Sequence, residues 1–167
     1  MKPSSNSPDS IHLLTSSLLY CPLLNAINLA CDAHRGQVDK SGDPYLWHVL
    51  RVGISLLPDV NAAQVGLLHD VFEDCDPSFR PLVEQLLSSN LAAAVQILTH
   101  SGVESYPAYI SRVLAAPGAA GDLARNVKRA DLLDNLSHSR LDRLHPALRA
   151  KLEARYRAAL RCLACCK

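Results

Sequence analysis

The chain has 167 residues and a mass of 18.1 kDa, which is the usual size of one domain. Hydrophobic residues make up 49% and charged residues 20%, so the composition excludes a disordered chain. The formal net charge of +1 gives no field that would attract nucleic acid or a membrane surface, and no apolar run approaches the roughly 20 residues of a membrane span. We therefore expect a single domain over residues 10–167, after a Ser- and Pro-rich tail at residues 1–9 that we expect to be disordered.

The six cysteines predict free thiols rather than a disulfide framework. A chain of this size can bury about 70% of its unfolded surface, so it needs no covalent staples. Its first ten residues, MKPSSNSPDS, contain no apolar signal segment. We therefore expect a cytoplasmic protein, in which Cys162, Cys165 and Cys166 lie at a frayed helix end rather than in a zinc site.

The spacing of apolar residues and of breakers is helical throughout the chain. Leu23, Ile27 and Ala30 recur at helical spacing, residues 37–44 (QVDKSGDP) read as a loop, and Pro58 ends the next apolar segment. The sequence has no alternating β-branched run of the kind that predicts a strand. The predicted fold class is all-α, a bundle of about seven or eight helices with no substantial sheet. The predicted helices cover residues 23–35, 45–57, 61–74, 77–87, 90–98, 104–115, 119–136 and 146–163.

The segment LLHDVFED at residues 67–74 places four ionisable side chains in an apolar helix. A buried carboxylate without a partner costs roughly several kcal/mol, so these groups need partners. Glu73 lies four residues after His69, and Asp74 lies four after Asp70, so on a continuous helix each pair shares a face. The pattern suits a metal site with acid–base groups one turn away, and it also suits a helix end with solvated carboxylates.

Two further positions extend this candidate site. His48 lies in the apolar segment PYLWHVLRV, and Asp131 lies in VKRADLLDNL, with Asn135 one turn later. Taken singly, such a histidine is typical of a core and such an aspartate of a solvent-facing position. Together with His69 and Asp70, they form a set of nitrogen and oxygen ligands that suits Mn²⁺, Fe²⁺ or Zn²⁺ and hydrolytic chemistry.

Four motifs, taken in order, resemble the HD-domain hydrolases of the RelA/SpoT type: AHRGQ (33–37), KSGDPYLWH (40–48), LLHDVFED (67–74) and VKRADLLDN (127–135). The resemblance runs from about residue 23 to residue 156. Enzymes of this type remove the 3′-pyrophosphate from the alarmone (p)ppGpp, and the stand-alone members are called small alarmone hydrolases. The resemblance implies an all-α enzyme that hydrolyses (p)ppGpp to GDP or GTP plus pyrophosphate.

The resemblance also implies roles for individual residues. The family's manganese ligands match four residues here: His48, His69, Asp70 and Asp131. The implied cofactor is therefore a divalent metal, with Mn²⁺ expected. Glu73 and Asp74 match the acidic pair that positions and activates the attacking water. The positions that contact the nucleotide in the family match Lys40, Ser41 and Asn135.

Two positions depart from the family pattern. Asp39 stands where the family has an arginine that stacks on guanine, and an aspartate cannot stack as a cation and repels phosphate. Asp134 replaces the histidine of the motif A-D-x-L-H-N. These changes leave the base preference open. Lys128 or Arg129 is a candidate for stabilising charge in the transition state, and we expect His34, in the AH motif, to be structural.

Several alternatives remain open at the level of sequence. The same chemistry could act on ppApp, on the 2′-phosphate of NADPH or on a nucleoside monophosphate. The altered loop could instead mark a regulatory module that binds nucleotide without turnover, although Glu73 and Asp74 argue against this. The Arg-rich segment 121–167 raises nucleic-acid binding, but it lacks an aromatic stacking platform. We expect a small-molecule nucleotide as the partner, with no nucleic acid and no membrane; the oligomeric state is unknown.

Overall fold

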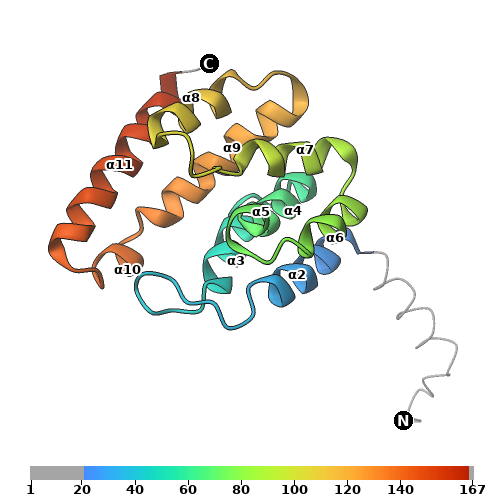
Figure 1. Cartoon of the computed structure of the whole chain (residues 1–167), viewed down its shortest axis with the longest axis horizontal. Coiled ribbons are helices and arrows are strands. Elements are labelled where there is room, and N and C mark those ends of the chain that lie inside the picture. Colours follow the sequence, from blue (N-terminus) through green and yellow to red (C-terminus); the bar gives the residue numbers. More distant parts are fainter. Residues whose placement is uncertain (1–20, 166–167) are drawn as a thin grey trace, which may run out of the picture.

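The computed structural model describes residues 21–165, and this part of the chain is all-α, which confirms the predicted fold class (Figure 1). Its one bridge between extended residues joins Val38 to Pro44. Two of the ten helices in the described part are single turns of four residues, so the longer ones agree with the predicted seven or eight. The helices are α2 (Pro22–Ala33), α3 (Leu46–Ser55), α4 (Val60–Leu68), α5 (Val71–Asp74), α6 (Phe79–Leu86), α7 (Ser89–Leu98), α8 (Tyr106–Ala115), α9 (Gly118–Asn135), α10 (His138–Leu141) and α11 (Pro146–Cys165).

Local chemistry explains where several helices begin. The carboxylate of Asp59 accepts a hydrogen bond from the amide of Ala62 (3.0 Å) and so caps the start of α4. The hydroxyl of Ser105 accepts from the amide of Ala108 (3.4 Å) at the start of α8. Pro22 opens α2, where its missing N–H costs nothing.

The continuous helix predicted over residues 61–74 is wrong. α4 ends before His69 and α5 begins after Asp70, so these two residues form a turn. The amides of Glu73 and Asp74 both donate to the carbonyl of Asp70, at 3.1 and 2.8 Å, which restarts the helix. Tertiary contacts of the two turn residues, described below, override the local helical pattern. The short helix α10 was not predicted either.

Helix α9 passes through the middle of the molecule and joins its two hydrophobic clusters (Figure 1). Ala124 and Val127 of α9 belong to the larger cluster, to which all the helices from α2 to α7 contribute. Leu132 belongs to a smaller cluster with α8 and α11. Burial of α9 on both sides fixes the side chains that project from its last turns, including the predicted ligand Asp131.

Two glycines allow α3 and α4 to approach closely. A Cβ atom on Gly66 would lie 3.2 Å from the Cα atom of Gly53, and a Cβ on Gly53 would lie 2.7 Å from Cγ of Leu67. A side chain at either position would therefore push the helices apart. This close crossing brings the rings of His48 and His69 to a centroid distance of 5.4 Å.

Several other predictions concern the ends and surface of the chain. The predicted tail at residues 1–9 and Cys166 lie outside the described residues. The five described cysteines are free, as predicted. Among the helices of residues 21–165, none is both long and apolar enough to cross a membrane.

Candidate active site

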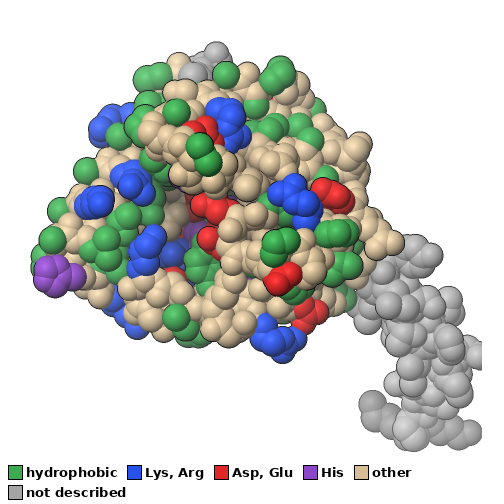
Figure 2. Space-filling view, in the orientation of Figure 1, with side chains coloured by type: hydrophobic (Ala, Val, Ile, Leu, Met, Phe, Trp, Pro, Cys, Tyr) green, Lys and Arg blue, Asp and Glu red, His purple; other side chains and the backbone are tan. Residues whose placement is uncertain are grey.

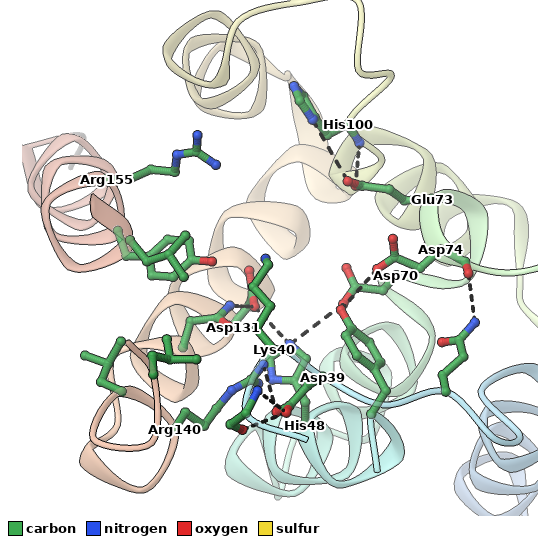
Figure 3. A pocket seen from close by; sticks show the side chains of 18 of the residues that line it. Asp39, Lys40, His48, Asp70, Glu73, Asp74, His100, Asp131, Arg140 and Arg155 are labelled. Carbon is green, nitrogen blue, oxygen red and sulfur yellow. Dashed lines mark hydrogen bonds and ion pairs between the residues drawn. The ribbon is translucent and has the colours of Figure 1, made fainter. Parts of the chain in front are cut away.

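A cavity of about 600 Å³ opens beside α9. Its walls come from the loop after α2, the turn between α4 and α5, and helices α8, α9, α10 and α11. Figure 2 shows acidic side chains within this hollow. In Figure 3, Asp70, Glu73 and Asp74 lie on one side of the cavity, and Arg140 and Arg155 lie on the other. The volume suits a small organic ligand, and the separation of charges suits one with anionic groups.

Four predicted metal ligands converge at the floor of this cavity. His48, His69 and Asp131 each offer one ligand atom, and these three atoms all lie within 4.8 Å of one another. Asp131 Oδ1 lies 3.2 Å from Nε2 of His48 and 3.7 Å from Nε2 of His69. Asp70 adjoins the group, because its Oδ2 lies 3.0 Å from Nε2 of His69 and 3.7 Å from Nε2 of His48. The structure therefore brings together residues that are up to 83 positions apart in the sequence.

The two imidazoles both turn Nε2 toward this group. Nδ1 of His48 is hydrogen-bonded to Oδ2 of Asp134 (2.7 Å), and Nδ1 of His69 is hydrogen-bonded to the carbonyl of Gly66 (2.8 Å). In the neutral rings, Nδ1 therefore holds the proton and Nε2 presents its lone pair. Nε2 of His69 is buried and has no hydrogen-bond partner within residues 21–165, since its short contact with Asp70 lacks hydrogen-bond geometry. A buried lone pair beside two carboxylates fits a divalent cation, so the residues present suit a metal.

Charges within the group shift the pKa values of its members in opposite directions. Burial alone would lower the pKa of His69, but the charges of Asp70 and Asp131 raise it. Burial alone would raise the pKa of Asp70 and of Asp131, but the charges of His69 and Lys128 respectively hold both well below the usual range. A divalent cation would take the place of the proton on His69, so metal binding releases a proton.

Tyr45 joins the candidate metal site to the acidic pair. Its hydroxyl lies 2.6 Å from Oδ2 of Asp70 and 3.1 Å from Oδ2 of Asp74. Burial and these two carboxylates raise the pKa of Tyr45, so the phenol stays protonated and donates. The sequence carried a signal for this residue, because Tyr45 begins the turn that leads into His48 in the PYLWH motif.

The predicted catalytic residues Glu73 and Asp74 both line the cavity. Oε2 of Glu73 accepts a hydrogen bond from the amide of His100 (2.9 Å), which fixes the carboxylate from the loop after α7. The main-chain carbonyl of Asp74 accepts a hydrogen bond from the side-chain nitrogen Nε2 of Gln37 (2.8 Å). Burial and neighbouring carboxylates raise the pKa of Glu73 and of Asp74, which favours groups able to exchange a proton.

Lys128 is the cation nearest the candidate metal site. Its Nζ lies 2.8 Å from Oδ2 of Asp131 and 4.9 Å from the ring centroid of Tyr109. Burial alone would lower the pKa of Lys128, but Asp131 raises it well above the usual value, so the ammonium is retained. Of the two candidates for charge stabilisation, Lys128 lines the cavity, whereas Arg129 is exposed and does not.

Asp134, the residue that departs from the family's histidine, supports the candidate ligand His48. Besides accepting from His48 Nδ1, it binds the guanidinium of Arg51 with both oxygens, at 2.6 and 3.0 Å. Arg140 adds a third contact at 2.9 Å. Burial alone would raise the pKa of Asp134, but these three partners hold it well below the usual value. A fixed carboxylate behind a ligating imidazole orients the ring and raises its basicity.

Asp39, the other departure, does not act on the cavity as an isolated negative charge. Its Oδ1 accepts from the amide of Ser41 (2.8 Å), from the hydroxyl of Ser41 (2.6 Å) and from the amide of Asp43 (3.1 Å). Its side chain is 4% exposed, and Oδ2 lies 3.5 Å from Nη2 of Arg140. The predicted repulsion of phosphate is therefore offset, because the carboxylate shapes the loop and is paired with a cation. The predicted contact residues Lys40, Ser41 and Asn135 all line the cavity.

Comparison with known proteins identifies the family. The chain matches no protein-family model. It is 34% identical over 122 residues to the guanosine-3′,5′-bis(diphosphate) 3′-pyrophosphohydrolase MESH1 of Danio rerio, and the match covers 68% of this chain and 67% of that protein. The chain belongs to this family of HD-type hydrolases.

Other members of the hydrolase family are longer. The chain is 39% identical over 75 residues to the pyrophosphohydrolase of the same name from Vibrio cholerae, and 36% identical over 77 residues to the bifunctional (p)ppGpp synthase/hydrolase SpoT of Escherichia coli. It spans 11% of the length of each of these two relatives. A solved structure described as a metazoan ortholog of SpoT that hydrolyzes ppGpp has the same fold, with a TM-score of 0.60 and 24% identity over 84% of this chain and 94% of that chain.

Four residues of this HD-type hydrolase were not singled out from the sequence as parts of the site: Tyr45, Arg51, His100 and Arg140. Tyr45 had a signal in its motif. The guanidinium groups of Arg51 and Arg140 meet only through Asp134, which lies 83 residues from Arg51 in sequence. No spacing rule connects such residues before the fold is known. His34 is buried and bonded to Gln37 (2.8 Å), in keeping with the structural role predicted for it.

Proposed function

We propose that the protein is a metal-dependent hydrolase that removes the 3′-pyrophosphate of (p)ppGpp, giving GDP or GTP plus pyrophosphate. The observation that carries the proposal is the convergence of His48, His69, Asp70 and Asp131 at the floor of a cavity whose wall holds two further carboxylates. Membership of a family whose relatives bear the name of this activity supports the same conclusion.

The proposed metal is Mn²⁺, held by the two imidazoles and by Asp70 and Asp131. When bound, such a cation supplies a Lewis acid beside the phosphorus and makes water a better nucleophile near neutral pH. A nitrogen and oxygen ligand set without thiolate suits Mn²⁺, and hydrolysis needs no change of metal oxidation state.

The remaining steps belong to the side chains of the chain itself. Glu73 and Asp74 orient the attacking water and take up its proton; Tyr45 fixes Asp74, and the amide of His100 fixes Glu73. The ammonium of Lys128 stabilises the negative charge that develops on the phosphoryl oxygens. Lys40, Ser41 and Asn135, which line the cavity, bind the nucleotide.

The first test is incubation of the purified protein with Mn²⁺ and ppGpp, with the products separated by chromatography. We expect GDP and intact pyrophosphate. Parallel reactions contain ppApp, NADPH and GMP, because the arrangement around Asp39 leaves the base preference open. Cleavage of one of these instead of ppGpp would support the proposed reaction but would show that the substrate is a different nucleotide. Binding of ppGpp without turnover of any substrate would replace the proposal with a regulatory module.

The Asp70→Asn variant tests whether the metal site performs this reaction. It removes the charge of a proposed ligand while keeping its shape, so turnover should be abolished with little loss of fold. Asp76→Asn is the matched control, because the side chain of Asp76 is fully exposed and, among the described residues, bonds only to Ser78. An active Asp70→Asn enzyme would contradict the proposed mechanism.

A further inference from the structure

Arg140 pairs with Asp39 in the loop that carries Lys40 and Ser41. It also pairs with Asp134, the carboxylate that supports the candidate ligand His48. Nη2 of Arg140 lies 3.5 Å from Oδ2 of Asp39, and Nη1 lies 2.9 Å from Oδ2 of Asp134. The two carboxylates are 95 residues apart in the sequence: Asp39 lies in the loop after α2 and Asp134 in α9. Figure 3 shows Arg140 beside Asp39. A planar guanidinium can bridge two such acceptors with its separate nitrogens, which an ammonium group cannot do at fixed geometry.

The pairing takes place away from water, which distinguishes it from ordinary surface ion pairs. The side chains of Arg140, Asp39 and Asp134 are 14%, 4% and 10% exposed. A second pair, between Arg143 and Asp43, fastens the far end of the same loop, but its arginine is 52% exposed. An exposed pair of this kind contributes little, so the hold on the loop depends on Arg140.

These contacts form a continuous series from the loop to a proposed metal ligand. The amide and hydroxyl of Ser41 donate to Asp39, Asp39 pairs with Arg140, Arg140 donates to Asp134, and Asp134 accepts from Nδ1 of His48. Among the described residues, Asp39 has no other ion-pair partner. Asp134 has a second one, since Arg51 binds it from the opposite direction.

We propose that Arg140 is a positioning residue. It holds the loop that carries Lys40 and Ser41 and, through Asp134, the imidazole of His48 in fixed positions relative to each other. The proposal rests on the proposed function and assigns to that site a determinant of substrate affinity. Loss of the Arg140 guanidinium leaves Asp39 buried and unpaired, so the loop moves and the substrate binds more weakly. Loss of Arg51 disturbs mainly Asp134 and His48. The charges of Asp39 and Asp43 act on Arg51, but among the described residues it forms no hydrogen bond or ion pair with the loop.

The test compares Arg140→Gln with Arg51→Gln, two changes that each remove one guanidinium from the same carboxylate. We expect Mn²⁺ affinity, measured by titration calorimetry, to fall in both variants. The KM for ppGpp should rise by about tenfold or more in Arg140→Gln, the equivalent of one lost charge-assisted contact, and stay within about twofold of wild type in Arg51→Gln. Asp39→Asn, a change in a loop rather than in a helix, should raise KM to a similar degree. The double variant Arg140→Gln/Asp39→Asn should be no worse than the poorer single variant, since both remove the same contact.

Amide hydrogen exchange provides a readout that does not need turnover. The amides of Ser41 and Asp43 donate to Asp39, so we expect them to exchange faster in Arg140→Gln than in wild type and to be unchanged in Arg51→Gln. If the wild type proves inactive on ppGpp, the proposed function fails while exchange and metal titration still decide the role of Arg140. Wild-type KM and exchange in Arg140→Gln, or an equal rise of KM in Arg51→Gln, would overturn the proposal.

Discussion

Replacing Asp134 with asparagine tests the role of the carboxylate behind His48. The change keeps the shape of the side chain and an oxygen that can accept from Nδ1, but it removes the charge. In the native protein this carboxylate accepts from His48 at 2.7 Å, from Arg51 at 2.6 and 3.0 Å, and from Arg140 at 2.9 Å. Among the described residues, the Asp134→Asn substitution would leave Arg51 without a carboxylate partner and Arg140 with Asp39 alone. It would also weaken the contact that orients the ring of His48.

Two magnitudes follow from these contacts. Loss of an oriented partner behind a ligating histidine lowers metal affinity by about 10- to 100-fold, which corresponds to about 1.4–2.7 kcal/mol. Hydrogen bonds to charged groups contribute about 1.5–3 kcal/mol, so the free energy of unfolding of the metal-free protein should fall by about that amount. The first quantity is measured by titrating the protein with Mn²⁺ in a calorimeter, and the second by urea denaturation in the presence of a chelator.

The control is Asp122→Asn, on the same helix. Asp122 is paired with Arg125 three residues later, but its side chain is 75% exposed, so its removal should change neither quantity appreciably. Mn²⁺ affinity within about twofold of wild type in Asp134→Asn would refute the reasoning, because it would mean that the imidazole of His48 is held well enough without a charged partner.

Three further predictions test other parts of the site and fold. Tyr45→Phe removes the hydroxyl that bonds Asp70 and Asp74, and it should lower kcat by roughly tenfold or more with little change in KM, which steady-state kinetics will show. Mn²⁺ at 100 times its Kd should raise the free energy of unfolding by about 2.7 kcal/mol, and a chelator should reverse the gain; a melting temperature indifferent to the metal would argue against a buried site. Asp59→Ala removes the cap on the amide of Ala62 and should cost about 1 kcal/mol of stability while leaving kcat/KM unchanged, so loss of activity at full stability would contradict its purely structural role.

Much of the helical bundle can be predicted from sequence because its signals are local. Apolar spacing and breakers such as Pro58 gave helix positions close to those observed for α2, α3, α7 and α9. The error between α4 and α5 has a different origin. His69 and Asp70 lie in a pattern that continues a helix. They leave it where their side chains meet Asp131 and Tyr45, which are distant in the sequence and which the local pattern does not contain.

The candidate site shows the same division between local and long-range information. Its proposed ligands could be named because histidine and aspartate in apolar surroundings need partners and because their motifs resemble a family. The residues that surround these ligands in the fold could not be identified from the sequence. The effect of Asp39 was predicted from its own charge, yet in the structure that charge is offset by Arg140, a residue 101 positions later. Electrostatics depends on which groups meet in space, and the sequence around one residue does not specify this.

The glycine contact between α3 and α4 has a consequence for which cations the protein can select. His48 lies five residues before Gly53, and His69 lies three residues after Gly66, so the distance between the two backbones sets the span across which the imidazoles face each other. Ligand distances in protein metal sites hold to within about 0.2 Å, a tolerance far smaller than the width of one methyl group. The two glycines lie in the crossing of α3 and α4 and not in the proposed ligand set. By setting the distance between these helices, they limit the size of the cation that the two imidazoles could hold.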